Sequence, residues 1–230
     1  MKDANNSRTR VVFLFDVDNT LVDNDSVAAD LQRHLANEVG DEGAQEYWRI
    51  FEQLRTELDY ADYLGALQRY RVEHPRAPHL LIISHFLINY AFAQRLFPHA
   101  LRAIEYLQQW GPAVIFSDGD VIFQPLKISR AGLNDAVSGR VLIYVHKEQE
   151  LEDVEQRFPA EHYVLVDDKL RILAAVKKSW GSRVTTVFVR QGHYATDSKI
   201  IDAYPPADIS IGHIGDLLEY DLPTLLVANT

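Results

Sequence analysis

Two carboxylates follow a short apolar run near the start of the chain. Asp16 and Asp18 come directly after the run 11–15, and Thr20 lies two residues further on. Such a run indicates a buried strand, and an open α/β sheet binds its ligands beyond the carboxyl ends of its strands. Carboxylates at this place can act as nucleophile, as acid or base, or as metal ligands. A solvated turn is the alternative interpretation, but it leaves the preceding strand unexplained.

A second acidic pair follows another apolar run. Asp167 and Asp168 come after Tyr163–Val166 and before the helical pattern Leu170–Trp180. Adjacent carboxylates repel each other unless a cation lies between them. Mg²⁺ favours oxygen ligands of this type. The pair therefore predicts a cation at the end of this strand.

A third candidate group ends the run Ala113–Ser117. Ser117 is followed by Asp118 and Gly119, so a hydroxyl stands beside a turn that contains glycine. The hydroxyl and the free N–H groups of such a turn can donate hydrogen bonds to phosphoryl oxygens. A common surface turn has the same composition, so this motif alone decides little.

One lysine is placed where it could offset the charge of a phosphoryl group. Lys147 comes two residues after the run Val141–Val145, and a lysine beside carboxylates and phosphate reduces their repulsion. Lys127 is the rival, but it lies in the helical stretch Phe123–Ala131, about ten residues past the end of its strand. We therefore favour Lys147.

The elements that must position these residues alternate along the chain. Short β-branched or aromatic runs are each followed by a turn and a helical pattern. The runs show no polar alternation, which indicates strands covered on both faces and therefore a parallel sheet in an α/β fold. The expected strands are Val11–Phe15, Ala113–Ser117, Val141–Val145, Tyr163–Val166, Val184–Val189 and Asp208–Ile211.

A long helical segment separates the first two expected strands. Residues 25–95 are rich in helix formers and aromatics, and Pro75 and Pro78 divide them into at least three helices, of which Leu80–Phe92 is expected to be buried. A structureless loop of this length would be unusual, so the segment is predicted to be a small inserted helical domain. Five of its arginines are available to meet a second anionic group on a substrate: Arg33, Arg49, Arg55, Arg69 and Arg71.

Composition excludes several classes of function. The 230 residues carry a net charge of −10 without a basic run, which disfavours nucleic acid and anionic membranes as partners. The absence of cysteine excludes disulfides, a thiol nucleophile and cysteine-ligated metals. No apolar run approaches the roughly 18 residues of a membrane helix, and the start lacks the apolar core of a secretory signal. We therefore expect a cytoplasmic protein, with its oligomeric state left open.

The sequence Asp16-Val-Asp-Asn-Thr20 resembles the first motif of the haloacid dehalogenase-like (HAD) superfamily. Most members are magnesium-dependent phosphohydrolases that act through an aspartyl-phosphate. Ser117, Lys147 and the pair Asp167-Asp168 match the later motifs in order, and the resemblance covers residues 10–220. It implies a Rossmann-like core formed by residues 1–24 and 96–230, with residues 25–95 as a helical cap that determines substrate choice.

The resemblance also implies roles for the motif residues. Asp16 corresponds to the nucleophile, and Asp18 to the acid and base. Mg²⁺ would be held by Asp16, the main-chain carbonyl of Asp18 and Asp168, with Asp167 acting indirectly. The remaining residues would orient the loop or hold the phosphoryl oxygens: Thr20, Ser117, Asp118, Gly119 and Lys147.

The implied activity is hydrolysis of a small phosphorylated metabolite, a phosphate monoester. Three alternatives share the fold: a phosphosugar mutase, a haloacid dehalogenase and a phosphoryl-binding protein without turnover. Asp18 favours the phosphatase over the dehalogenase, because a halide leaves without a proton and haloacid dehalogenases lack this residue. A receiver domain beginning near Asp167 is excluded, because the chain after it is shorter than the roughly 100 residues such a domain needs.

Overall fold

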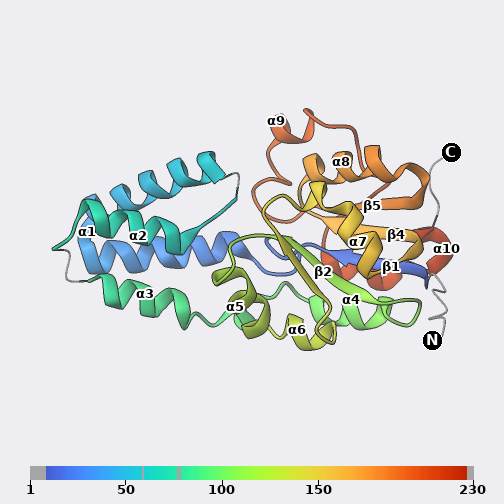
Figure 1. The fold of residues 1–230 in the computed structure, drawn as a ribbon, viewed down its shortest axis with the longest axis horizontal. Helices are drawn as coiled ribbons and strands as arrows, with labels where there is room; N and C mark the ends of the chain where they lie inside the picture. The colour runs from blue at the N-terminus through green and yellow to red at the C-terminus, as the bar shows by residue number, and fades with distance from the viewer. Residues whose placement is uncertain (1–8, 59, 77–78, 227–230) are drawn as a thin grey trace, which may run out of the picture.

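The computed structural model describes residues 9–58, 60–76 and 79–226. Within these ranges six strands form one parallel sheet in the order β3-β2-β1-β4-β5-β6 (Figure 1). This is the doubly wound order, and it confirms the predicted parallel α/β fold. The strands are β1 (Thr9–Phe15), β2 (Ala113–Asp118), β3 (Val141–Tyr144), β4 (Ala160–Asp167), β5 (Val184–Val189) and β6 (Ile209–Ile211).

Helices cover both faces of this sheet. Alternate residues of β1 enter two separate cores, with Phe13 and Phe15 on one side and Val12 and Leu14 on the other, and all four are fully buried. The first core includes α4 (Ala100–Leu107), α5 (Phe123–Arg130), α6 (Leu133–Ala136), η4 (Ile214–Glu219) and α10 (Leu222–Leu225). The second includes α7 (Leu151–Arg157), α8 (Leu170–Trp180) and, packed against it, α9 (Ser198–Ile201). Burial on both faces explains the absence of alternation in the strand sequences.

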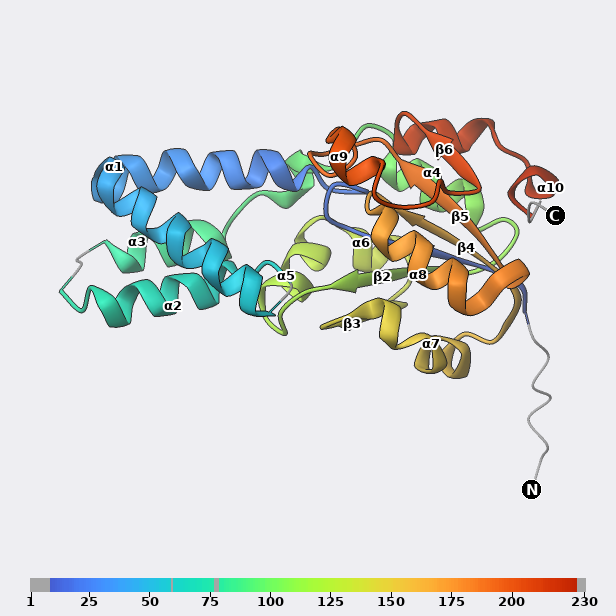
Figure 2. The same cartoon turned by 90° about the horizontal axis from the view of Figure 1, so that it is seen from above.

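Between β1 and β2 the chain forms a helical unit at one end of the molecule. Figures 1 and 2 both place these helices together and away from the sheet. Pro75 lies between the second and third helices, whereas Pro78 is outside the described residues. The unit comprises α1 (Asn24–Leu58), which is kinked at Gly40, α2 (Tyr63–Glu73), α3 (Leu80–Ile88) and the 3-10 helix η1 (Phe92–Arg95).

The expectation that Leu80–Phe92 forms a buried helix is wrong in extent. The helix α3 ends at Ile88, and Leu81 is 78% exposed while Ile83 and Leu87 are buried. A helix at the edge of a small unit has neighbours on one side only, so a continuous apolar run cannot be buried on every face.

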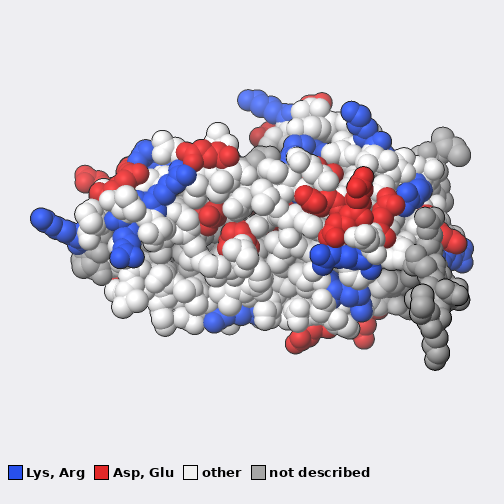
Figure 3. Space-filling view, viewed as in Figure 1, with Lys and Arg blue, Asp and Glu red and all other residues white. Residues whose placement is uncertain are grey.

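The face of the molecule shown in Figure 3 carries charges of both signs, and acidic side chains gather over α7. Glu152 and Asp153 lie in the first turn of α7 and Arg157 in its last turn. This arrangement complements the dipole of the helix. Among the described residues, no helix combines the length and the hydrophobicity needed to cross a membrane.

We expect replacement of Asp208 by alanine to destabilise the edge of the sheet. The Asp208 carboxylate accepts hydrogen bonds from Lys177 Nζ at 2.8 Å, from Thr186 N at 2.8 Å and from Thr186 Oγ1 at 2.9 Å. Loss of a charged acceptor that serves several donors should lower the free energy of unfolding by about 2–4 kcal/mol, measured by urea denaturation. The matched control is Asp202→Ala at an exposed position, with an expected change within about 0.5 kcal/mol.

The contribution of Asp208 should depend on pH in a defined direction. Burial opposes its charge, but the hydrogen bonds from Lys177 and Thr186 outweigh burial and lower its pKa. The stabilisation should therefore be complete above the ordinary carboxyl pKa, about 3.9, and should be lost as the pH falls below it. A destabilisation by Asp208→Ala that persisted unchanged in strong acid would contradict this explanation.

Candidate active site

The two acidic motifs meet at the carboxyl ends of adjacent strands. Because β1 pairs with β4, with Phe15 opposite Val166, the residues that follow these strands are neighbours. One carboxylate oxygen from each of Asp16, Asp167 and Asp168 lies within 4.8 Å of the others, and all three residues are buried. The site is at the switch point of the sheet, where α/β folds bind their ligands.

Lys147 lies inside this acidic cluster. Its Nζ is 2.6 Å from Asp16 Oδ1 and 2.7 Å from Asp167 Oδ2, and it also donates to the carbonyl of Phe116 at 3.1 Å. Burial alone would lower the pKa of Lys147, but the carboxylates of Asp16 and Asp167 raise it above its usual value. The ammonium therefore stays charged and holds Asp16 in one orientation.

The cluster has the donor set that a divalent cation requires. Both oxygens of Asp168 and Oδ2 of Asp16 are buried without a hydrogen-bond partner in the part of the chain that the structure describes, although buried polar atoms are normally partnered. Burial raises the pKa of Asp168, so the charged form needs a compensating cation. The oxygens fit Mg²⁺. Asp167 is already paired with Lys147 and accepts a hydrogen bond from Lys169 N at 2.8 Å, which leaves Asp168 better placed as a direct ligand.

Asp18 lies apart from the cluster, with its side chain 22% exposed. Its Oδ1 accepts a hydrogen bond from Lys127 Nζ at 2.5 Å, and Gln124 Nε2 is 3.4 Å from its Oδ2. Lys127 is fully buried and also donates to Asn24 Oδ1 at 3.0 Å. From the sequence, Lys127 is considered only as a rival of Lys147 and set aside. A charged residue on the apolar face of α5, one turn after Phe123, was the signal that could have found it.

The turn after β2 closes around Gln124. Its Nε2 donates to Ser117 Oγ at 2.9 Å, and Asp118 Oδ1 accepts from the main-chain N–H of Lys147 at 2.7 Å. Gly119 has φ of 154°, and a Cβ there would lie 2.7 Å from the Gln124 side chain. The approach of Gln124 therefore requires glycine at this position.

Thr20 is fully buried within the loop that follows β1. Its main-chain N–H donates to the carbonyl of Val17 at 3.3 Å, and its Oγ1 is enclosed without a hydrogen-bond partner among the described residues. The structure therefore shows Thr20 as a packed residue of the motif, and its expected orienting role remains a prediction.

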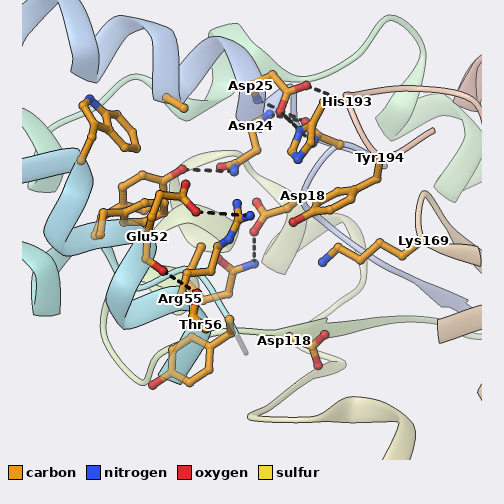
Figure 4. A pocket seen from close by; sticks show the side chains of 18 residues that line it. Asp18, Asn24, Asp25, Glu52, Arg55, Thr56, Asp118, Lys169, His193 and Tyr194 are labelled. Atoms are coloured by element: carbon orange, nitrogen blue, oxygen red, sulfur yellow. Dashed lines mark hydrogen bonds and ion pairs between the residues drawn. The ribbon is translucent and has the colours of Figure 1, made fainter. Parts of the chain in front are cut away.

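A cavity of about 810 Å³ opens between this site and the helical unit (Figure 4). Its volume lies in the range of small-molecule sites. The motif residues Asp18 and Asp118 line one end. The helical unit contributes Asn24, Asp25, Ala28, Trp48, Phe51, Glu52, Arg55, Thr56, Tyr60, Ala61 and Tyr63.

Three further lining residues, Lys169, His193 and Tyr194, were given no role from the sequence. Lys169 follows the acidic pair directly, and its Nζ is 5.5 Å from the centre of the Tyr194 ring. In the loop after β5, His193 contacts Asp25 at the start of α1, with its N–H 2.8 Å from Asp25 Oδ2 and its Nδ1 2.6 Å from Oδ1. The position of Lys169 next to Asp168 was a usable signal, whereas the loop offered none.

Comparison with known proteins shows the family of the chain. A family model described as haloacid dehalogenase-like hydrolase matches residues 11–179. The chain belongs to the haloacid dehalogenase-like hydrolases. A solved HAD-like protein from Burkholderia xenovorans LB400 is 62% identical, covers 93% of this chain and 99% of its own, and superposes with a TM-score of 0.90.

More distant HAD structures share the fold. The L-2-haloacid dehalogenase of Xanthobacter autotrophicus, with chloropropionic acid covalently bound, is 18% identical over 92% of this chain and 97% of its own, with a TM-score of 0.59. A magnesium-bound HAD hydrolase from Bacillus subtilis is 17% identical over 92% of this chain and 98% of its own, with a TM-score of 0.61. A comparison with curated proteins found no match.

Proposed function

We propose that this HAD hydrolase is a magnesium-dependent phosphatase that cleaves a small phosphate monoester through an aspartyl-phosphate at Asp16. The observation that carries the proposal is the placement of Asp16 against Lys147 and Asp168, with Asp18 exposed to the cavity only two residues later. A proton donor beside the nucleophile is useful for an alkoxide leaving group but not for a halide. This supports phosphatase chemistry over dehalogenation.

In the first step, an Asp16 oxygen attacks phosphorus while the bond from phosphorus to the ester oxygen breaks. Asp18 gives its proton to that oxygen, so a neutral alcohol leaves. Lys147 keeps Asp16 aligned, and its charge reduces repulsion between the carboxylate and the anionic phosphoryl group. Ser117 holds the phosphoryl oxygens, whereas the main-chain N–H of Gly119 already donates to the carbonyl of Tyr144 at 3.0 Å.

In the second step, Asp18, now a carboxylate, removes a proton from water. The resulting hydroxide attacks phosphorus and breaks its bond to the Asp16 oxygen, which releases inorganic phosphate and restores Asp16. The partial exposure of Asp18 lets water reach it from the cavity. Asp16, Asp168 and the main-chain carbonyl of Asp18 would hold Mg²⁺, which when bound would neutralise the charge that develops on the transferring group.

The direct test is a panel of phosphate esters assayed for release of inorganic phosphate. We expect hydrolysis that stops with a chelator and returns when magnesium is added. Release of chloride from 2-chloropropionate without any hydrolysis of phosphate esters would instead establish a dehalogenase.

The replacement Asp168→Asn is expected to separate activity from stability. It removes a metal ligand, so phosphatase activity should fall by a factor on the order of 10² or more. It also removes a buried carboxylate. Because burial raises the pKa of this carboxylate, its charged form destabilises the metal-free fold, and the destabilisation grows as the pH rises through that pKa. At neutral pH in chelator, Tm should therefore rise by about 3 °C or more, measured by calorimetry.

Magnesium provides the control for this measurement. It should raise the Tm of the wild-type protein and leave that of Asp168→Asn nearly unchanged. Equal stabilisation of both proteins by magnesium would show that Asp168 is not a ligand.

A further inference from the structure

The cavity extends well beyond the residues that the proposed reaction uses. Of those residues, Asp18 lines the cavity at the end next to the sheet, the core end, whereas residues 48–56 of α1 and residues 60–63 at the start of α2 form the opposite end, the cap end. At about 810 Å³ the cavity can hold a whole small molecule. An ester bound with its phosphoryl group beside Asp16 would therefore place its leaving group toward the cap end.

One arginine of the helical unit reaches this cavity. Arg55 lines it, and Figure 4 shows its side chain extending from α1 toward the side where Asp18 lies. Both the Asp18 carboxylate and the Arg55 guanidinium affect the pKa of the Tyr63 hydroxyl. Burial raises this pKa, Asp18 raises it further, and Arg55 lowers it. Arg55 and Asp18 therefore act on the same region of the cavity.

The other arginines considered from the sequence do not line this cavity. Three of them form ion pairs within the helical unit: Arg33 with Asp30, Arg49 with Glu46 and Glu73, and Arg69 with Glu57. Arg71 is exposed. The structure thus distinguishes Arg55 from its four rivals.

Arg55 is held only loosely by its neighbour. Its guanidinium is 3.3 Å from Glu52 Oε2, and both side chains are partly exposed, at 39% and 55%. An exposed pair of this spacing stabilises a helix weakly, and a guanidinium has further donors suited to carboxylate or phosphate oxygens. Beside it the rings of Phe51 and Tyr63 stack with centroids 4.8 Å apart. A charge pair formed against this apolar wall is stronger than one in water.

We infer that the substrate is a phosphate monoester whose alcohol part carries a second anionic group, a carboxylate or a phosphate, and that Arg55 binds that group. The inference rests on the proposed function. Lys169 does not supply this second contact, because it directly follows the metal-binding pair and faces Tyr194 at the core end of the cavity.

The test compares pairs of esters that share a carbon skeleton. Phosphoglycolate carries a second carboxylate, and hydroxyethyl phosphate is its neutral control. Propanediol bisphosphate carries a second phosphate, and hydroxypropyl phosphate is its neutral control. The wild-type protein should prefer at least one anionic ester. Arg55→Met should lower kcat/KM for that ester by about 10- to 100-fold, mainly through KM, and change the neutral ester by less than about threefold. The matched control Arg49→Met, on the same helix but outside the cavity, should preserve the preference.

A binding measurement separates this inference from the proposed function. Calorimetric titration of phosphoglycolate and propanediol bisphosphate into Asp16→Asn protein, with and without Arg55→Met, requires no turnover. Weaker binding of an anionic ligand in the double variant would support the Arg55 site even if no ester were hydrolysed. Absence of anionic preference in the wild type, or equal losses for anionic and neutral esters in Arg55→Met, would overturn it.

Discussion

Replacing Asp16 by asparagine is expected to reduce kcat/KM for every phosphate ester by a factor on the order of 10⁴ or more. The amide is nearly isosteric with the carboxylate, but it cannot form the acyl-phosphate. The covalent step is therefore lost for every ester, whether its leaving group is good or poor. The loss should appear in release of inorganic phosphate under saturating magnesium. Asp202→Asn, a change of the same type at an exposed site, should leave the rate unchanged.

Folding of the Asp16 variant must be checked separately, because Lys147 loses one of its two carboxylate partners. Circular dichroism and thermal unfolding should show a native fold, since Asp167 still accepts from the ammonium. A folded Asp16→Asn protein that kept more than about a tenth of its activity would contradict a nucleophilic role, given the size of effect expected for covalent catalysis.

The variant Asp18→Asn is expected to show a loss that depends on the leaving group. It keeps the nucleophile but removes the proton donor, which matters most when the departing oxygen is strongly basic. An alkyl phosphate should therefore lose about 10²- to 10⁴-fold in rate, and an aryl phosphate clearly less. Steady-state rates for one ester of each kind, measured with wild type and variant, give the comparison.

The same variant tests the second half of the cycle. Without the base that activates water, an aspartyl-phosphate formed from the aryl ester should persist and be detectable as incorporated phosphate. Equal losses for alkyl and aryl esters would assign Asp18 a structural role, with Lys127 and Gln124 as the partners that it holds in place.

The fold was predictable because its signals are local. Each strand is a short apolar run, and Val184–Val189 and Leu170–Trp180 have the bounds expected from the sequence. The ends of other elements differ, since tertiary contacts decide them: β4 begins at Ala160, three residues before its apolar run, because Thr9 of β1 pairs with Ala160 there.

The candidate site was predictable where a residue follows a strand. Asp16 and Asp168 directly follow β1 and β4, Ser117 is the penultimate residue of β2, and Lys147 comes three residues after β3. Sheet topology alone therefore brings them to one edge. Lys127 was not predictable in this way, because its approach to Asp18 depends on which face of α5 meets the sheet. The catalytic roles of all these site residues stay predictions.

The cap end of the cavity was the least predictable part. Five arginines in the helical segment have similar sequence surroundings, and only the packing of α1 against α2 decides which of them faces the cavity. Likewise, the contact between His193 and Asp25 joins residues 168 positions apart, and no local sequence pattern predicts it. Such contacts arise from the assembled fold.

The most direct measurement for the proposed reaction is identification of the phosphorylated residue. Protein mixed with magnesium and an aryl phosphate, and quenched in acid within one turnover, should carry phosphate that peptide mass mapping assigns to Asp16. The Asp18→Asn protein should carry more of it, because its breakdown is slowed. Phosphate on any other residue, or hydrolysis that proceeds without labelled protein in either form, would contradict the account.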